Sequence, residues 1–323
     1  MTTFKEIRGN LIKSTSTDPA NPQEGQIWYN STSQVLKGEE FLEAWSAGGS
    51  MSTPRRDPAG FGTQSATVSA AGHGASAYIT DTEEYDGSAW TAGTAYPGAV
   101  AYMGSTGTLT AGLVFGASGP GTPNTATYDY DGSTWTAGGN LGSGRYDMGG
   151  AGTQTAALSY GGSVTTNVES YNGTAWTSTT ALNTARRAPA SVGTQTAALA
   201  AGGKFSPTPT DITANVEEWN GSSWTEVNNL PAPTLLMGSA GIQTDALVFG
   251  GSQGAPLLAT TAAYDGTNWS SKPNMSTARD RMGSGQYVSP STAAIAFAGN
   301  SPSPSGVTEE FTAAPVTRTF TTS

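Results

Sequence analysis

Seven arginines recur at one place in the sequence pattern, shortly before a glycine-rich segment. They are Arg55, Arg56, Arg145, Arg186, Arg187, Arg279 and Arg281. A guanidinium group binds an oxyanion through two parallel hydrogen bonds. If the fold brings these segments together, the arginines form a cluster that binds a carboxylate, a sulfate or a sugar acid. The alternative is that they pair with the acidic doublets Glu83-Glu84, Glu217-Glu218 and Glu309-Glu310.

Other residues capable of chemistry are isolated or have a structural explanation. His73 is the single histidine and the chain has no cysteine, so neither a metal site nor a catalytic triad is expected. Asp86, Asp131 and Asp265 each precede a glycine, where a turn explains them without calcium. No tyrosine stands apart from the repeats as a sialidase nucleophile would. We therefore expect no enzymatic activity, no cofactor and no metal.

The elements that carry the arginines are repeats of roughly 45 residues. Their shared mark is a tryptophan, found at Trp45, Trp90, Trp135, Trp176, Trp224 and Trp269. Five of these residues close a short phrase with an aromatic start and an Asp-Gly or Asn-Gly step, which indicates a two-residue hairpin turn. Because side chains alternate along a strand, the two aromatic residues lie on one face. We expect that face to pack on a neighbouring unit.

A second phrase, Gly-Thr-Gln-Thr-Ala-Ala in its fullest form, precedes the hairpins and leads to a glycine doublet. It occupies residues 152–157 and 193–198, with variants at 62–66 and 241–246. A glycine doublet followed by a spaced Tyr and Trp resembles the kelch repeat, although the Tyr-to-Trp interval is one residue short. This resemblance covers residues 50–323 and implies a β-propeller of four-stranded blades.

The repeats predict an all-β, six-bladed kelch-like β-propeller over residues 39–323. The blades are expected at roughly 50–93, 94–139, 140–180, 181–227, 228–273 and 274–323. Residues 39–49 add an outer strand before the first blade, which predicts that N-terminal chain closes the ring by pairing with the last blade. The last repeat lacks both the Asp-Gly turn and the tryptophan. Seven blades is the second interpretation.

Residues 1–38 lack the repeated phrases, and their sequence predicts a docking arm with a short β-hairpin. A turn-rich stretch leads into Ile27, Trp28 and Tyr29, an apolar group that needs a covering surface. That surface is either a partner protein or the rim of the propeller. The phrase at residues 18–38, with the Gly-Thr-Gln-Thr-Ala-Ala repeats, resembles kelch-like virion proteins of marine tailed bacteriophages.

Composition and resemblance together predict the partners. The 24 acidic and 14 basic residues give a net charge of −10, which argues against nucleic acid and anionic membranes as partners. Neither a membrane-inserting stretch nor a signal peptide is recognisable. The resemblance implies a tail, fibre or decoration protein of a virion, made in the host cytoplasm, which binds other virion proteins through its arm and a host glycan or receptor through its propeller. The alternative is a glycan-binding or glycan-cleaving, sialidase-like propeller.

Overall fold

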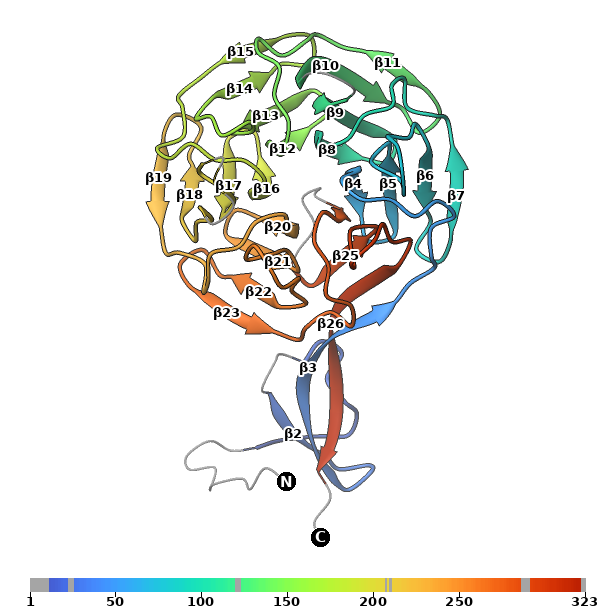
Figure 1. The fold of residues 1–323 in the computed structure, drawn as a ribbon. Helices are drawn as coiled ribbons and strands as arrows, with labels where there is room; N and C mark the ends of the chain where they lie inside the picture. Colours follow the sequence, from blue (N-terminus) through green and yellow to red (C-terminus); the bar gives the residue numbers. More distant parts are fainter. Residues whose placement is uncertain are drawn as a thin grey trace. The chain divides into compact units, whose positions relative to one another are not determined.

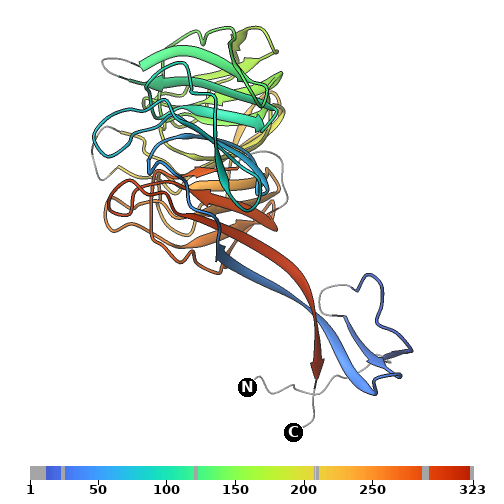
Figure 2. The ribbon, with the colours of Figure 1, turned by 90° about the vertical axis from the view of Figure 1, so that its right-hand side faces the viewer.

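A computed structural model describes residues 12–22, 26–119, 123–206, 208, 211–285 and 291–320 of the 323-residue chain. All regular elements in these ranges are β-strands, so the predicted all-β class is confirmed, and none of them contains a helix that could cross a membrane. Contacts divide the chain into a larger unit, residues 44–311, and a smaller unit formed by residues 1–43 and 312–323. The larger unit is a β-propeller, seen along its axis in Figure 1 and from the side in Figure 2.

Five antiparallel blades each consist of four consecutive strands. The innermost strands are β4 (Ala59–Thr63), β8 (Gly104–Thr108), β12 (Gly149–Thr153), β16 (Ala190–Thr194) and β20 (Gly238–Ile242). The second strands are β5 (Ala66–Ala70), β9 (Ala111–Ser118), β13 (Ala156–Tyr160), β17 (Ala197–Ala201) and β21 (Asp245–Phe249). The third strands are β6 (Thr82–Tyr85), β10 (Pro123–Tyr130), β14 (Val168–Tyr171), β18 (Val216–Trp219) and β22 (Thr261–Tyr264). The outermost strands are β7 (Trp90–Gly93), β11 (Trp135–Ala137), β15 (Trp176–Ser178), β19 (Trp224–Val227) and β23 (Trp269–Lys272).

A composite sheet takes its strands from both ends of the chain, in the order β1-β2-β3-β26-β25-β24. Its members are β1 (Lys13–Thr15), β2 (Ile27–Asn30), β3 (Val35–Ala47), β24 (Gly283–Ser284), β25 (Ala293–Phe297) and β26 (Thr308–Phe320). The prediction of six blades is therefore corrected. The structure has five blades of four consecutive strands, and this composite sheet in addition. The physical reason is that the last repeat supplies only three strands. N-terminal β3, which overlaps the expected closing strand 39–49, lies beside β26.

The Asp-Gly turns are wider than the sequence predicted. In the first blade the strand pairing ends at Tyr85 opposite Trp90, which leaves residues 86–89 in the loop. The Asp86 carboxylate accepts hydrogen bonds from the backbone N–H groups of Ser88 and Ala89, both at 2.8 Å. Gly87 alone has a positive φ, at 91°. The Asp86 carboxylate therefore takes the place of the second backbone hydrogen-bond acceptor of a two-residue turn.

The repeated tryptophans pack between blades, as the sequence predicted. The Trp90 ring centroid lies 5.0 Å from that of Tyr85 in its own blade and 4.9 Å from that of Phe297 in β25. Its indole N–H donates to the Thr308 hydroxyl. Equivalent pairs of a tryptophan and an aromatic ring of the preceding sheet are Trp135 with Phe61, Trp176 with Phe115, Trp224 with Tyr160, and Trp45 with Phe249. Each such contact joins two successive sheets of the ring.

The glutamine of the Gly-Thr-Gln phrase joins each blade that carries it to the sheet before it. Gln154 donates from its amide to the carbonyls of Gly112 and Tyr130 in the second blade, at 3.0 and 3.2 Å. Gln243 donates in the same way to Ala198 and Trp219, at 3.0 and 2.7 Å. Gln64 and Gln195 make equivalent bonds. The phrase is visible in the sequence, and the structure shows that its glutamine links neighbouring sheets.

Two tryptophans provide a matched test of this packing. Trp90 is buried, whereas Trp135 is half-buried and donates to a carbonyl at the surface. Trp90→Ala is expected to lower the free energy of unfolding by about 3–5 kcal/mol, because it leaves a cavity between two sheets. Trp135→Ala should cost clearly less. Urea unfolding followed by circular dichroism measures both, and equal losses would contradict the proposed difference in burial.

Candidate functional site at the channel entrance

A closed circle of main-chain hydrogen bonds surrounds the propeller axis. Its members, called the ring residues below, each lie two positions before an innermost strand: Asp57, Tyr102, Asp147, Ala188, Leu236 and Arg281. Each ring residue donates its N–H to the carbonyl of the previous one, over distances from 2.7 to 3.2 Å. The Asp57 N–H closes the circle on the Arg281 carbonyl, at 2.8 Å. This circle fixes six side-chain positions at the centre of the ring.

All ring residues adopt a left-handed backbone, with φ between 52° and 63°. This conformation costs a residue with a side chain about 1 kcal/mol or more, and glycine would adopt it without strain. None of the six positions holds glycine. Strained residues cluster at ligand-binding and catalytic sites, so the centre of the ring is the first place to look for a site.

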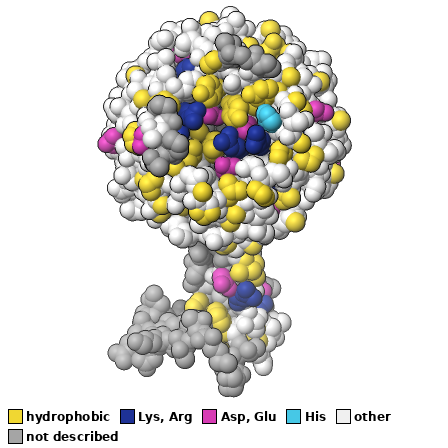
Figure 3. Space-filling model, in the orientation of Figure 1, with side chains coloured by type: hydrophobic (Ala, Val, Ile, Leu, Met, Phe, Trp, Pro, Cys, Tyr) yellow, Lys and Arg dark blue, Asp and Glu magenta, His cyan; other side chains and the backbone are white. Residues whose placement is uncertain are grey.

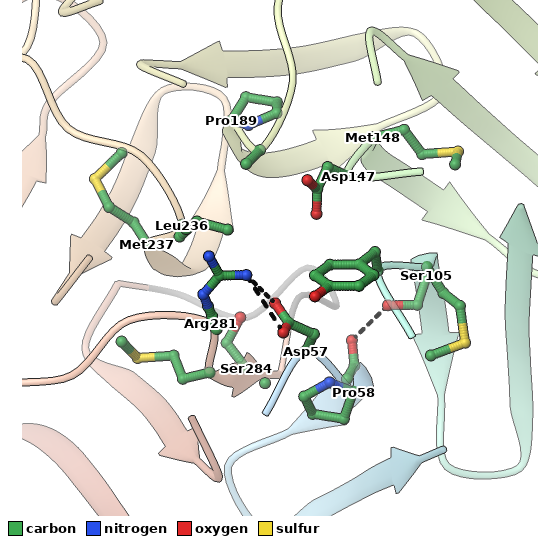
Figure 4. Close-up of a pocket in the computed structure, with 16 residues that line it drawn as sticks. Asp57, Pro58, Ser105, Asp147, Met148, Pro189, Leu236, Met237, Arg281 and Ser284 are labelled. Atoms are coloured by element: carbon green, nitrogen blue, oxygen red, sulfur yellow. Dashed lines mark hydrogen bonds and ion pairs between the residues drawn. The ribbon is translucent and has the colours of Figure 1, made fainter. Parts of the chain in front are cut away.

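An inner cavity of about 90 Å³ lies among these residues. Figure 4 shows the Arg281 guanidinium directed at the Asp57 carboxylate, and Asp147 directed into the same space. The Arg281 Nη1 atom lies 3.5 Å from each Asp57 oxygen, and its Nε lies 3.7 Å from Asp280. Ser105 lines the same cavity and donates to the Gly60 carbonyl at 2.9 Å. The cavity is therefore polar and holds charges of both signs.

The two carboxyl groups of this cavity have raised pKa values. Burial raises the pKa of Asp57 to about 8, although the positive charge of Arg281 opposes the shift. Burial also raises the pKa of Asp147 to about 6, against the charges of Arg187 and Arg281. At neutral pH a protonated Asp57 can therefore donate a hydrogen bond as well as accept one. Strong shifts of this kind are frequent at functional sites.

An outer cavity of about 440 Å³ shares several ring residues and extends towards Tyr146, Arg187 and Lys204. The Arg187 guanidinium lies 5.9 Å from the centre of the Tyr146 ring and donates to its hydroxyl at 3.2 Å. Figure 3 shows Lys and Arg side chains gathered at the centre of this face of the ring, with acidic side chains beside them. The inner and outer cavities together are called the channel entrance.

Four of the seven arginines predicted to bind a ligand lie elsewhere. Arg55, Arg145, Arg186 and Arg279 are 1% exposed or less. Each forms a buried ion pair with a glutamate of its own sheet, respectively with Glu83, Glu169, Glu217 and Glu309, at distances from 2.5 to 2.9 Å. Protein encloses these four guanidinium groups, so they cannot contact a ligand in this conformation. The alternative pairing with the acidic doublets is confirmed for Arg55, Arg186 and Arg279, whereas Arg145 pairs with Glu169, a glutamate outside those doublets.

The surroundings of Arg186 illustrate how complete this enclosure is. Its Nη1 atom donates to the carbonyls of Gly202 and Asn215, at 3.1 and 2.8 Å. Glu217 pairs with the other terminal nitrogen and also accepts from the Asn183 N–H at 2.8 Å. Burial lowers the pKa of Arg186, and the charge of Glu217 opposes that shift. The pair thus ties a loop to two strands of the fourth blade.

Blades two and five lack both partners of this ion pair. The arginine lies two residues before a ring residue, where these blades have Val100 and Thr234. The glutamate lies two residues before the aromatic end of the third strand, where they have Tyr128 and Ala262. The two charges are therefore present together or absent together. This pattern avoids an unpaired buried charge, which is strongly destabilising.

The remaining predicted arginines, Arg56, Arg187 and Arg281, lie close to the ring residues. Arg187 and Arg281 line the outer cavity, and Arg56 lies 3.9 Å from the Asp57 carboxylate. Lys204, Tyr102, Tyr146 and the two ring aspartates also line the channel entrance and were not predicted from the sequence. Tyr102, Asp57 and Asp147 share a fixed offset from an innermost strand, a signal that can be used only when the strand starts are known, whereas Lys204 follows a glycine doublet after the second strand of its blade.

The predicted docking residues have different environments within the smaller unit. Trp28 is fully buried and donates to Asp18 at 3.0 Å, so the expectation that it is exposed was wrong. Asn30 and Lys37 also donate to the Asp18 carboxylate, at 2.7 and 2.6 Å. These bonds, that of Lys37 first, lower the pKa of Asp18 to about 2. Ile27 is half-buried, and Tyr29 is 38% exposed.

His73 and the turn aspartates have the structural environments expected of them. The His73 Nδ1 atom lies 2.7 Å from the Gly74 carbonyl, and its ring packs edge-on against Tyr78. Asp131 and Asp265 accept hydrogen bonds within their own turns. Among the described residues, no three acidic or histidine side chains are grouped as metal ligands would be.

The buried ion pairs predict an asymmetry between single and double substitutions. Arg186→Met alone is expected to cost about 3–5 kcal/mol of stability, because it leaves the Glu217 charge buried without its partner. The double variant Arg186→Met, Glu217→Met should lose much less, since blades two and five fold without either charge. Urea unfolding of the two variants tests this. A double variant as unstable as the single one would show that the pair is needed for more than charge balance.

The raised pKa of Asp57 predicts how stability depends on pH. An unfolded aspartate loses its proton near about pH 4, whereas folded Asp57 keeps it until about pH 8. The folded state then binds more protons across this range, so Asp57 lowers the free energy of unfolding as pH rises from 4 to 8. Asp57→Asn removes this titration, and asparagine tolerates a left-handed backbone. We expect the variant to gain about 1 kcal/mol or more over the wild type between pH 5 and pH 8 in urea unfolding, and a difference that does not change with pH would contradict this.

Comparison with known proteins adds no relative to this description. No protein-family model and no curated protein matches the chain. The resemblance to kelch repeats and to phage virion proteins therefore depends on the repeated sequence phrases and on the phrase at residues 18–38 alone. A function has to be inferred from the fold and from the two units.

Proposed function

We propose that the chain is a non-enzymatic structural component of a phage particle, as a tail, fibre or decoration protein. In this proposal the smaller unit docks to another virion protein, and the propeller presents its loops for contact with the host surface or with neighbouring subunits. The observation that carries the proposal is the smaller unit, a second compact unit that combines an N-terminal and a C-terminal segment of the chain. The sequence resemblance to kelch-like virion proteins supports the same role.

The smaller unit has an apolar surface that a docking partner can cover. Ile12, Tyr29 and Leu42 are exposed, and they are three of the five large exposed apolar residues among the described ones. Tyr29 lies directly opposite Leu36 in the pairing of β2 with β3, so both are on one face of the sheet. The other face carries Trp28 and the Asp18 hydrogen bonds. Exposed apolar surface of this kind supports a protein contact, and tyrosine is enriched in such contacts.

The propeller is suited to presenting loops because its sheets are tied to one another in several ways. The main-chain circle, the tryptophans and the phrase glutamines each link neighbouring sheets. The second glutamate of each doublet adds another link, by accepting a hydrogen bond from a tyrosine of the next blade: Glu84 from Tyr130, Glu218 from Tyr264, and Glu310 from Tyr85. A rigid scaffold of this kind lets loops vary without loss of the fold.

We also propose that the composite sheet acts as a sixth blade and completes a six-bladed kelch-like propeller. It contributes Arg281 to the main-chain circle and contains the buried pair Arg279–Glu309. Trp45 of β3 contacts Phe249 of the fifth blade, as the tryptophans of other blades do with their neighbours. Strand β3 in this interpretation closes the ring from the N-terminal end of the chain.

A pair of exposed aromatic residues tests the docking role. Tyr29→Arg places a charge in the proposed contact and is expected to abolish incorporation into particles. The matched control is Phe205→Arg in the propeller, a residue 44% exposed, which should leave incorporation unchanged. Copies per purified particle are measured by quantitative mass spectrometry, and thermal unfolding confirms that both variants fold. Normal incorporation of the folded Tyr29→Arg variant would argue against docking through this face.

A propeller that binds or cleaves a glycan is the second candidate function, and the channel entrance is the observation that favours it. This region combines a protonated carboxyl, cationic side chains and tyrosine hydroxyls. Release of oligosaccharides from host polysaccharide by the purified protein would favour cleavage over binding. The docking role and this candidate concern different units, so one can fail without the other.

A further inference from the structure

Arg187 and Lys204 lie directly opposite each other in the fourth blade, on two segments joined by an isolated antiparallel bridge. The Arg187 N–H donates to the Lys204 carbonyl at 2.8 Å, and the Lys204 N–H donates to the Arg187 carbonyl at 2.9 Å. Side chains of residues paired in this way leave the same face, with Cβ atoms about 5 Å apart. Two positive charges at these positions repel each other and destabilise the pairing.

The positive charge of Lys204 has no counterpart within the described chain. Lys204 is only 7% exposed, and its ammonium group forms no ion pair or hydrogen bond with a described residue. The polar contact of the Arg187 guanidinium is with the neutral Tyr146 hydroxyl. Asp147 faces the same cavity, but its carboxylate forms neither an ion pair nor a hydrogen bond with either cation among the described contacts. Lys204 therefore lines the outer cavity with no ionic partner among the described contacts, and a ligand in that cavity can supply one.

The corresponding bridges elsewhere in the ring do not combine two permanent cations. They pair Arg56 with His73, Ala101 with Ser118, Leu235 with Ser252, and Asp280 with Asn300. Ser118, Ser252 and Asp280 line the same outer cavity as Arg187 and Lys204. The cations of the fourth blade therefore face hydroxyl and carboxylate groups across the channel. An arrangement found in one blade alone is not required by the repeat.

We propose that Arg187 and Lys204 bind the carboxylate of an acidic sugar at the channel entrance. The outer cavity of about 440 Å³ falls within the roughly 300–1,000 Å³ of small-molecule sites, and it is much larger than a simple inorganic anion needs. The serine and tyrosine hydroxyls suit the hydroxyl groups of a sugar ring. Asp147 and Asp280 accept hydrogen bonds from those groups and repel an anion that carries more than one charge. This inference deepens the second candidate function, and it concerns binding only.

Titration calorimetry of the full chain tests the site with three probes: glucuronic acid, glucose and sodium sulfate. We expect glucuronic acid to bind, glucose to bind at least about tenfold more weakly, and sulfate not to compete. Lys204→Met and Arg187→Met should each weaken glucuronic acid binding about tenfold, which corresponds to the loss of one charged hydrogen bond. Arg318→Met removes an exposed arginine from the smaller unit and should leave binding unchanged. Equal binding of sulfate and glucuronic acid, or no binding of glucuronic acid, would overturn the proposal.

Thermal unfolding without ligand provides an independent readout of the same variant. Lys204→Met removes a like-charge contact, so it should raise the Tm by about 2 °C while it weakens glucuronic acid binding about tenfold. A lysine retained only for the fold would lower the Tm when replaced. A fall in Tm with unchanged glucuronic acid binding would therefore overturn the assignment. Incorporation into particles is measured separately through Tyr29, so failure of this site and failure of the docking role are distinguishable.

Discussion

The main-chain circle around the axis is the constraint on which the rest of the propeller depends. Each ring residue must adopt a left-handed backbone to donate its N–H to the previous member and still turn into an innermost strand. The circle is complete only when all six members are present, so the geometry of each sheet depends on the whole ring. Because the members carry side chains and are not glycine, the same backbone that closes the fold also places Asp57, Asp147 and Arg281 in the channel.

The charged residues of the repeat serve two separate purposes that the sequence does not distinguish. In the arginine doublets, the first residue is buried against a glutamate, whereas the second is close to the channel: Arg187 lines the outer cavity and Arg56 lies 3.9 Å from the Asp57 carboxylate. Thus Arg186 stabilises the fourth blade, whereas its neighbour Arg187 lines a cavity. Alternation of side chains along an extended segment is enough to explain the difference. Paired charge stabilises the blades, whereas the cations at the channel entrance are the ones that we propose to bind a ligand.

Much of the architecture could be predicted because it repeats. The period of the tryptophans and the paired phrases are typical of a ring of β-sheets, and the extra strand before residue 50 indicated closure from the N-terminal side. The last sheet differs from the five blades because it pairs β3 with β26, and the sequence indicated this pairing only through the extra strand before residue 50. The site was harder to predict. Lys204 follows a glycine doublet in a loop that differs between blades, and Asp57 and Asp147 belong to no repeated phrase and share only an offset from an innermost strand.

The composite sheet has a consequence for how the protein is made. Strand β3 leaves the ribosome among the first strands and β26 is the last, yet the two are neighbours in one sheet. At roughly 5–20 residues per second, the nascent chain spends on the order of tens of seconds with its ring open. The unpaired edge of β3 needs protection from other nascent chains during that time. A chain released before β26 has been made lacks the partner of β3, so its ring stays open.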